Sequence, residues 1–296
     1  MDVGEGRSRA SLWVEVSLLM TVFFFGTNFV AVKYVVDFVP PLLFAAVRFT
    51  VAGVVLWLIL RAVEPQSRIP RKELLPIFGL GVVGITLTQS VFTIGVSLTT
   101  AANTALIYST APVWGMLLGF FLTLERPRLS GIIGVGLCLA GVTAIVYGGL
   151  EFGGTSLAGD VLILAAAIFW GSYTVLSLSL LRRHSPLAVA TYSILLGGLA
   201  IFPLAAVGPG QLEVGALGVP VWGAALYSTV LSSGFGFAAW QRGVSQVGAN
   251  RVLVYQYLVA LTGVIAGIVL LGEAFGYQQA IGAAVVLAGV YLARKR

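Results

Sequence analysis

Long apolar runs separated by short polar connections make up the chain from residue 12 onward. A helix that crosses about 30 Å of hydrocarbon needs about 20 mostly apolar residues. The runs lack the alternation of apolar and polar positions that is typical of a membrane β-strand. The pattern therefore predicts an all-α integral membrane protein with ten transmembrane helices, at residues 12–34, 41–62, 75–97, 102–123, 131–150, 158–181, 187–207, 218–240, 250–271 and 276–293.

The composition favours the same class of protein. Hydrophobic residues make up 58% of the 296 residues and charged residues only 9%, with a mean hydropathy of +1.01, whereas soluble domains carry about 25% charged residues. We therefore expect lipid to cover most of the outside. The first run is longer than a signal-peptide core and no small-residue cleavage site follows it, so it is predicted to be a retained helix.

The positions of Lys and Arg predict an orientation. All but two of the 17 basic residues fall in the terminal tails or in every second connection. The exceptions are Lys33, at an outer edge, and Arg48, inside the second helix. Because cytoplasmic loops are enriched in Lys and Arg, we predict that both termini are cytoplasmic in a multi-pass protein of the cell (inner) membrane. The basic residues form no patch among polar ones, so no nucleic-acid partner is expected.

Several short segments of the first half recur in the same order in the second half. The matches are ANTALIY (102–108) with ANRVLVY (249–255), FFGTN (24–28) with FWGSY (169–173), GMLLG (115–119) with GVIAG (263–267), Glu125 with Glu273, Gly134 with Gly282, and Gly141 with Gly289. Residues 1–148 and 149–296 are therefore predicted to be two copies of one five-helix repeat. Because five is odd, the second copy enters the membrane from the opposite side, which makes the repeats inverted.

Inverted repeats are typical of secondary transporters, which place the substrate near the bilayer midplane at the repeat interface. The sequence offers no chemistry for an enzyme: GLGVVG (79–84) fits a nucleotide-binding pattern, but it lies inside an apolar helix with no preceding strand. A single cysteine, Cys138, excludes a multi-cysteine metal site. We expect transport without a cofactor or metal, and the partners are a small-molecule substrate and the lipid bilayer.

The repeated motifs also carry a family resemblance. The WG[ST]-type segments, the A-N-x-x-L-[IV]-Y openings and the G-E-x8-G-x6-G-V endings resemble the drug/metabolite transporter (DMT) superfamily and, within it, the ten-helix EamA-type exporters. Leu124 departs from this pattern, because the second copy has Gly272 before its glutamate. The aromatic-rich composition is similar to the YddG-type exporters of aromatic amino acids. The resemblance implies a cavity lined mainly by the first, third, fourth, sixth, eighth and ninth helices, with the fifth and tenth helices at the periphery of a monomer or homodimer.

Polar and aromatic side chains inside the predicted helices are the candidates for substrate binding. Exposing a polar group to lipid is costly, so these residues are expected to face the interior. They are Thr27, Asn28, Gln89, Phe92, Tyr108, Trp114, Trp170, Ser172, Tyr173, Phe237, Tyr255 and Tyr257. Hydrogen bonds between helices would explain the polar members without any substrate.

Three further residues are candidates for a gate or a scaffold. Arg48 either meets a substrate carboxylate or bonds helix-end carbonyls, and we favour the scaffold because the second helix is not expected to line the cavity. Asn103 and Asn250 stand at the starts of the fourth and ninth helices, where Asn is a favoured cap. A polar gate on each side of the membrane is the alternative role for both asparagines.

A wall of rings and neutral polar groups favours a small amphipathic substrate. Neutral or aromatic amino acids fit, and cationic aromatic drugs also fit through cation–π contacts. No acidic residue lies in the middle of a predicted helix, so we expect facilitated export rather than strict proton coupling, with Glu15 as the remaining candidate for a proton carrier. A membrane receptor or scaffold that binds such a solute without moving it is the alternative of another class.

Overall fold

The structure is a computed structural model that describes residues 3–123, 129–152, 156–206 and 217–294, and no strand occurs in these ranges. The helical segments are α1 (Val3–Val36), α2 (Pro41–Val63), η1 (Arg71–Glu73), α3 (Leu74–Gly81), η2 (Val82–Leu87), α4 (Thr88–Leu98), α5 (Ala101–Tyr108), α6 (Ala111–Thr123), α7 (Leu129–Phe152), α8 (Leu157–Leu181), α9 (Pro186–Leu199), α10 (Phe202–Ala205), α11 (Val219–Tyr227), η4 (Ser228–Gly236), α12 (Phe237–Val247), α13 (Ala249–Val252), α14 (Tyr255–Leu271) and α15 (Tyr277–Arg294). Apart from end residues and short breaks, each apolar run predicted to span the membrane is helical.

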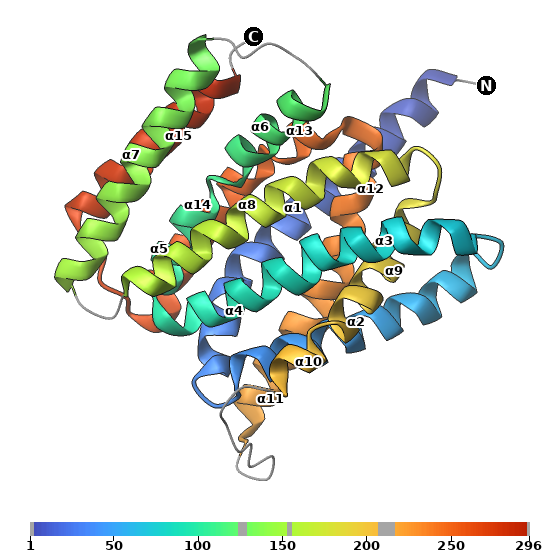
Figure 1. Cartoon of the computed structure of the whole chain (residues 1–296), viewed down its shortest axis with the longest axis horizontal. Helices are drawn as coiled ribbons and strands as arrows, with labels where there is room; N and C mark the ends of the chain where they lie inside the picture. Colours follow the sequence, from blue (N-terminus) through green and yellow to red (C-terminus); the bar gives the residue numbers. More distant parts are fainter. Residues whose placement is uncertain (1–2, 124–128, 153–155, 207–216, 295–296) are drawn as a thin grey trace.

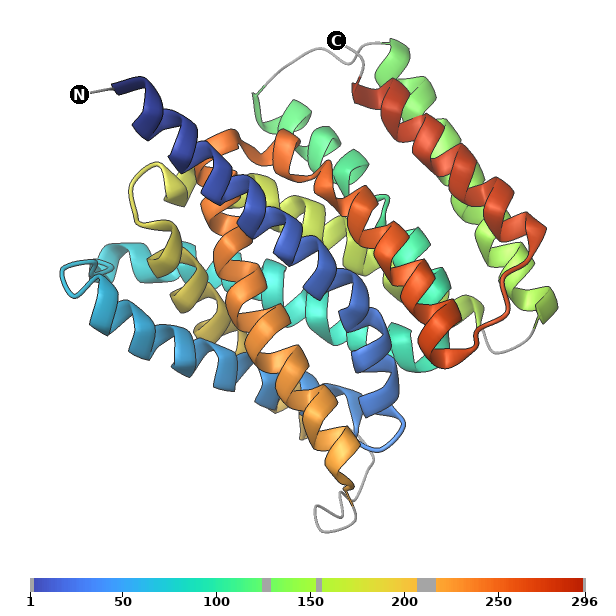
Figure 2. The ribbon, with the colours of Figure 1, turned by 180° about the vertical axis from the view of Figure 1, so that it is seen from behind.

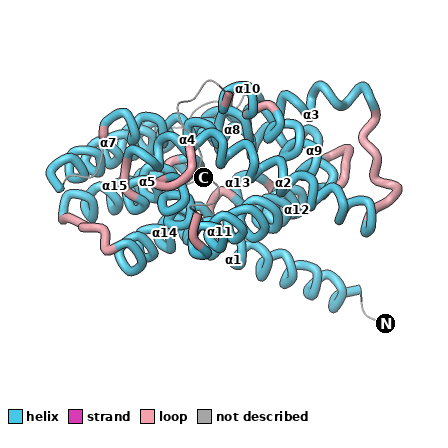
Figure 3. The backbone as a smooth tube through the Cα atoms, turned by 90° about the horizontal axis from the view of Figure 1, so that it is seen from below, coloured by secondary structure: helices cyan, strands magenta, loops and turns pink. Residues whose placement is uncertain are grey.

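Seven of the described helical segments are long and apolar enough to cross a membrane by length and composition. They are Leu12–Val36, Pro41–Val63, Arg71–Leu98, Ala101–Leu122, Leu157–Leu181, Pro186–Ala205 and Ala249–Leu271. Large apolar side chains cover the outside of the described helices, and Trp13 of α1 and Trp222 of α11 expose 69% and 52% of their surface. Such a surface suits lipid, and exposed indoles are typical of the membrane–water interface. The first turns of α1 extend beyond the other helices (Figure 3).

Helices from the two halves of the chain pack mainly against each other. In the first half, α1 packs against α14, η4 and α12; in the second half, α8 packs against α5, α6 and α4. The second helices of the two halves, α2 and α9, also lie side by side. Figure 1 shows α8 crossing the middle of the bundle, and Figure 2 shows α1 crossing it on the opposite face. The first helix of each half therefore has an equivalent central place.

The pair α7 and α15 lies at one edge of the bundle (Figure 1). The backbones of the two helices lie so close together that there is no room for a side chain at the contact. A Cβ added to Gly141 would lie 2.7 Å from the Gly282 carbonyl oxygen, and a Cβ added to Gly289 would lie 2.7 Å from the Gly134 carbonyl oxygen. Small residues permit such close approach between membrane helices. These glycines are the ones that the sequence matches between the two halves, and they meet crosswise.

Four irregular places interrupt the long helices near the centre. The segments η2 and η4 are π-helical, with wider turns than an α-helix, and they lie at matching places in the two halves. The helix formed by α5 and α6 is broken at residues 109–110, and the helix formed by α13 and α14 is broken at residues 253–254, near its start. In the first of these, Pro112 has no N–H to donate to the carbonyl of Tyr108. Irregular backbone at membrane depth is tolerated only where it is covered by protein or lines a cavity.

The start of α1 and the end of α15 lie at the same end of the bundle (Figure 1 and Figure 2). We call this end the termini end, and we call the opposite end the far end. The turns after α2, α8 and α12 reach the termini end. The basic residues in and beside these turns are Arg61, Arg68, Arg71, Lys72, Arg182, Arg183, Arg242 and Arg251. Several other basic residues used to predict the orientation (Arg126, Arg128, Lys295 and Arg296) lie outside the described residues.

Candidate functional site

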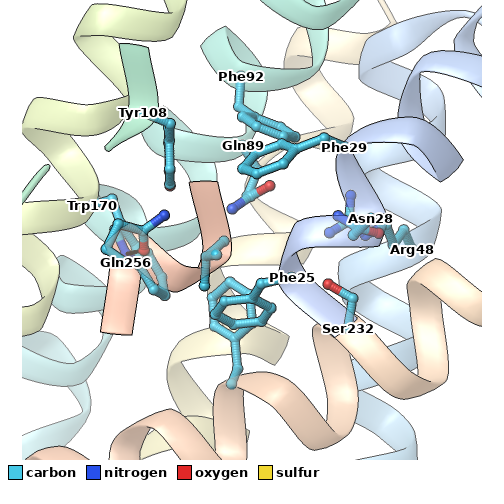
Figure 4. Close-up of a pocket in the computed structure, with 12 residues that line it drawn as sticks. Phe25, Asn28, Phe29, Arg48, Gln89, Phe92, Tyr108, Trp170, Ser232 and Gln256 are labelled. Carbon is cyan, nitrogen blue, oxygen red and sulfur yellow. Dashed lines mark hydrogen bonds between the residues drawn. The ribbon is translucent and has the colours of Figure 1, made fainter. Parts of the chain in front are cut away.

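A small cavity lies at the centre of the bundle, among the irregular helices (Figure 4). It is lined by Phe25, Asn28, Phe29, Arg48, Gln89, Phe92, Tyr108, Trp170, Ser232, Phe237, Gln256 and Val259. Its volume is about 40 Å³, counted as the space open to the centre of a water molecule. One water needs roughly 10–15 Å³ of such space, so about three waters fit. An amino acid would need the walls to move apart.

Both halves of the chain contribute to the walls. The first half supplies side chains from α1, α2, α4 and α5, and the second half from α8, η4, α12 and α14. These include every helix that the family resemblance implied. They also include α2, which was not expected, because Arg48 lies in the wall. The cavity therefore sits where the two halves meet.

Aromatic rings cover the cavity on both sides. Towards the termini end, the ring of Trp170 lies 5.1 Å from that of Phe237 and 5.9 Å from that of Phe25, between centroids. Towards the far end, Phe29, Phe92 and Tyr108 form a triangle. Its centroid distances are 5.9 Å for Phe29 to Phe92, 6.1 Å for Phe29 to Tyr108 and 5.6 Å for Phe92 to Tyr108. Gln89 lies between the two ring groups (Figure 4).

Arg48 brings a charge into this apolar setting. Only 2% of its surface is exposed, its Nε donates to the Ser233 hydroxyl at 2.6 Å, and its guanidinium carbon lies 4.6 Å from the centroid of the Phe49 ring. Its Nη1 is buried and has no hydrogen-bond partner. Among the described residues, ion pairs are found only around Glu73 at the termini end. A buried cation without a counter-ion is costly, so the wall is electrostatically incomplete as it stands.

Two buried amides in the wall also have unused hydrogen-bonding atoms. Gln256 accepts from the Trp170 indole N–H through Oε1 at 3.3 Å, while its Nε2 is unpaired. The Oε1 of Gln89 is unpaired as well. Asn28, in contrast, accepts from the Ser228 hydroxyl at 2.6 Å. Because the two ends of an amide exchange by rotation, Gln89 and Gln256 can each present either a donor or an acceptor to a bound molecule.

A set of polar contacts, which we call the far-end latch, joins the two halves at the far end. The Glu273 carboxylate accepts from the backbone N–H groups of Ala101 at 2.7 Å and Ala102 at 2.8 Å. Gln279 donates to the Asn103 side-chain oxygen at 2.5 Å. Glu273 lies between α14 and α15 and Gln279 lies in the first turn of α15, and both contact the first turn of α5, where backbone N–H groups have no partner within the helix. The latch thus ties the second half of the chain to the first at this end.

The termini end is hollowed instead. A second pocket there has a volume of about 450 Å³ in the same measure. It is lined by Ser17, Val63, Glu64, Pro186, Leu187, Phe235, Ala238, Ala239, Arg242 and Gln246. Phe237 lines the central cavity, while the next two residues of α12 line this larger pocket. The rings of Phe25 and Phe237, with centroids 5.6 Å apart, lie at this side of the central cavity.

The model of the EamA-like transporter family matches this chain twice, over residues 12–147 and over residues 157–294. The chain belongs to the EamA-like transporter family. It is therefore a multi-pass membrane transporter that binds a small molecule within the bilayer, and the resemblance read from the repeated motifs is confirmed.

Relatives of this EamA-like protein cover almost its full length. An uncharacterized transporter of Archaeoglobus fulgidus is 25% identical over 96% of this chain and 99% of its own. A probable terminal-alkyne amino-acid exporter of Streptantibioticus cattleyicolor is 29% identical over 95% and 93%, respectively. A probable amino-acid metabolite efflux pump of Salmonella typhimurium is 26% identical over 93% and 92%. A solved crystal structure shares the fold, with a TM-score of 0.65 at 21% identity over 95% of this chain and 96% of its own.

Half of the substrate-binding residues expected from the sequence line the central cavity of this EamA-like protein. They are Asn28, Gln89, Phe92, Tyr108, Trp170 and Phe237. The matched tyrosines differ, because Tyr108 lies in the wall, whereas Tyr255 and Tyr257 are partly buried against the core.

The other expected residues are used within the protein. Thr27 donates to the Phe23 carbonyl at 2.7 Å and shares a hydrogen bond with the Tyr227 hydroxyl. Ser172 donates to the carbonyl of Ile168 at 2.8 Å. Trp114 donates to the Thr110 hydroxyl at 3.1 Å. Tyr173 is fully buried behind Trp170, with ring centroids 5.5 Å apart and its hydroxyl 3.4 Å from that of Ser193.

The expected capping role of the asparagines is wrong. The cap of α5 is Thr100, whose hydroxyl accepts from the Asn103 N–H at 3.1 Å, and Asn103 is the third residue of the helix, where it takes part in the far-end latch. Asn250 is exposed in the first turn of α13, which begins after Gly248. In both cases the helix begins one residue earlier than the apolar pattern predicted, at Ala101 and at Ala249, and the cap position falls on Thr100 and Gly248.

Sequence reasoning missed five residues of the cavity wall. They are Phe25, Phe29, Ser232, Gln256 and Val259. Gln256 could have been found, because it is an amide inside an apolar run directly after the repeated ANRVLVY motif. Phe25 could also have been found, because it matches Trp170 when FFGTN is aligned with FWGSY. Phe29 and Val259 gave no signal, because an apolar side chain in a membrane helix suits lipid as well as a cavity.

Proposed function

We propose that this EamA-like protein exports small amphipathic solutes, above all neutral and aromatic amino acids, by alternating access around the central cavity. The carrying observation is a cavity between the two halves in which rings surround an unpaired cation, Arg48, and two amides with unused atoms. Rings suit an apolar side chain, and the polar atoms suit the backbone end of an amino acid. A cationic aromatic drug fits less well, because Arg48 would repel it.

The proposed topology has ten transmembrane helices in two inverted repeats, residues 1–148 and 149–296, with both termini in the cytoplasm. Support comes from the two successive matches of the family model. The crosswise glycine contacts between α7 and α15 are what an in-plane two-fold axis produces. The basic turns at the termini end favour its placement in the cytoplasm.

Amino-acid export is also suggested by the relatives. The Streptantibioticus cattleyicolor relative is named an amino-acid exporter, and the Salmonella typhimurium relative an amino-acid metabolite efflux pump. At 29% and 26% identity the side chains that select the substrate can differ. We therefore propose the class of solute rather than one amino acid.

In the proposed cycle this structure is a contracted state, closed at the far end and hollowed at the cytoplasmic end. Loss of the far-end latch would let the halves rock and widen the central cavity towards the outside. None of the side chains that line the central cavity is acidic, and the candidate proton carrier Glu15 is exposed on α1 outside that wall. We accordingly propose facilitated transport driven by the substrate gradient.

Counterflow in proteoliposomes tests the proposal. Liposomes loaded with unlabelled phenylalanine should accumulate external labelled phenylalanine transiently, with and without an imposed pH difference. Threonine, tryptophan and methyl viologen as competitors would define the range of solutes. Binding without counterflow would show a receptor instead of a transporter, and accumulation that requires the pH difference would contradict the facilitated mechanism.

A further inference from the structure

We propose that the central cavity recognises its substrate by the carboxylate, through Arg48, and does not require an amine. The substrate class would then be apolar and aromatic monocarboxylates, with α-amino acids as one subset. This inference rests on the proposed function, because it concerns the same cavity. It assigns to Arg48 the role of specificity-determining residue, in place of the scaffold role that the sequence favoured.

The geometry leaves one side of the guanidinium available. Ser233 holds Nε at 2.6 Å, and the Phe49 ring lies against the guanidinium at 4.6 Å from its central carbon. These contacts fix the plane of the group but leave Nη1 without a partner in a residue that is only 2% exposed. A positioned guanidinium N–H is a strong, charge-assisted donor to a carboxylate, and Nη1 supplies such a donor here.

If Arg48 were a scaffold residue, we would expect its guanidinium to have more hydrogen-bond partners than it has in the structure. A structural arginine in a membrane protein typically pairs with an acid or with backbone carbonyls. Here Arg48 donates to a neutral hydroxyl, that of Ser233, and the described acids lie away from the cavity wall. Asp160 bonds Thr99 and Glu273 bonds α5 at the far end, while Glu64 bonds Ser185 at the termini end. The missing counter-ion is therefore best supplied by a bound anion.

No equivalent partner exists for an ammonium group. Among the residues that line the cavity, Gln89 and Gln256 offer unused amide atoms and the rings offer their faces. Both are neutral, and a neutral acceptor gives an ammonium much less than a carboxylate would. The wall thus carries one positive charge with nothing to balance it. A monoanion matches this charge, a zwitterion matches it at one end, and a cation without a carboxylate is repelled.

Three ligands that differ only in their charged groups separate these cases. We would measure inhibition of labelled phenylalanine counterflow, and thermal shift of the purified full-length protein, with phenylalanine, 3-phenylpropionate and phenethylamine. The expected result is that 3-phenylpropionate competes at least as well as phenylalanine. Phenethylamine should be weaker by about 10-fold or more, because it leaves the guanidinium unpaired.

Substitutions at Arg48 test the assignment directly. Arg48→Gln should weaken binding of 3-phenylpropionate by about 10- to 100-fold, the range for a lost charged hydrogen bond, and Arg48→Lys should weaken it less. Arg61→Gln is the matched control, because Arg61 lies near the end of the same helix, outside the cavity, with its Nη2 3.4 Å from the Tyr192 hydroxyl. Without ligand, Arg48→Gln should unfold at the same or a higher temperature, since it removes an unpaired cation; a clear fall would support the scaffold role.

The outcomes distinguish this inference from the proposed function. Counterflow inhibited equally by phenethylamine and phenylalanine, or carboxylate selectivity that survives Arg48→Gln, would overturn the inference and leave transport intact. Binding of 3-phenylpropionate that depends on Arg48, with no counterflow of any ligand, would support the inference and overturn transport.

Discussion

Replacing Glu273 with Gln tests whether the far-end latch holds the far end closed. The carboxylate accepts two backbone hydrogen bonds, from Ala101 at 2.7 Å and from Ala102 at 2.8 Å. Both donors belong to the first turn of α5, where the helix dipole is positive and the N–H groups have no partner inside the helix. The side chain therefore connects the second half of the chain to the first with charge-assisted bonds.

The size of the effect follows from these two bonds. A hydrogen bond to a charged group contributes about 1.5–3 kcal/mol, and a negative charge at a helix N-terminus adds about 0.3–1 kcal/mol. Gln keeps one acceptor oxygen but loses the charge, so one bond disappears and the other weakens. We expect the free energy that favours the closed far end over the open one to fall by about 2–3 kcal/mol. That loss changes the ratio of closed to open molecules by about 30- to 150-fold.

A single reporter cysteine can measure this ratio. Cys138 is the one cysteine of the sequence and is buried, so Cys138→Ala gives a background without a reactive thiol. Val259→Cys then places a thiol in the wall of the central cavity, where the native side chain is fully buried. A membrane-impermeant maleimide, added at the extracytoplasmic side, should label this thiol faster when Glu273 is Gln.

The control is Asp37→Asn, which removes a charge from an exposed residue just after α1 at the same end. It should leave the labelling rate unchanged. If Glu273→Gln labels no faster than this control while the protein stays folded, the carboxylate does not hold the far end closed, and the reasoning from its two hydrogen bonds is refuted.

Three further predictions concern packing, the cavity and topology. Gly141→Val should lower the unfolding temperature by an amount equivalent to about 1–3 kcal/mol, because a Cβ at residue 141 would lie 2.7 Å from the Gly282 carbonyl oxygen. Gly136→Val in the same helix is the control; a Cβ there meets nothing within 4 Å, so the unfolding temperature should change little. Trp170→Ala should lower the free energy of unfolding by about 3–5 kcal/mol. It should also weaken the binding of aromatic ligands more than Trp170→Phe does, since the indole contacts both ring groups around the cavity. Equal ligand affinities in the two variants would contradict the place of Trp170 in the wall. Accessible tags on the N- and C-termini should both react only from the cytoplasmic side, and a split result would exclude the inverted repeat.

Much of the architecture could be predicted because it depends on local sequence. A run of about 20 apolar residues favours a helix in lipid whatever its neighbours, since the backbone must satisfy its own hydrogen bonds there. Cap positions were less predictable. The helices that contain Asn103 and Asn250 each begin one residue earlier than their apolar pattern, because their N-cap positions are Thr100 and Gly248.

The composition of the cavity wall was predicted only in part. Polar residues such as Asn28 and Gln89 are conspicuous within apolar runs, and burial follows from the cost of exposing them to lipid. Phe29 and Val259 are not conspicuous, because lipid-facing and interior faces are both apolar in a membrane helix. Thr27 and Ser172 are polar residues that were expected in the cavity wall but do not line it. The hydroxyl of each donates to the carbonyl four residues earlier in its own helix and therefore needs no partner in a cavity.

The sequence by itself determined that this EamA-like protein is helical and embedded in a membrane, because the length of the apolar runs and the shortage of charge permit no other class. Its internal matches also predicted which glycines correspond between the halves. Only the tertiary structure decided that Arg48 shares a cavity with Gln89 and Gln256 rather than with a carboxylate. The physical reason is that a helix apolar on every face carries no period that marks its inner side. The neighbours of Arg48 therefore depend on how distant helices pack against α2.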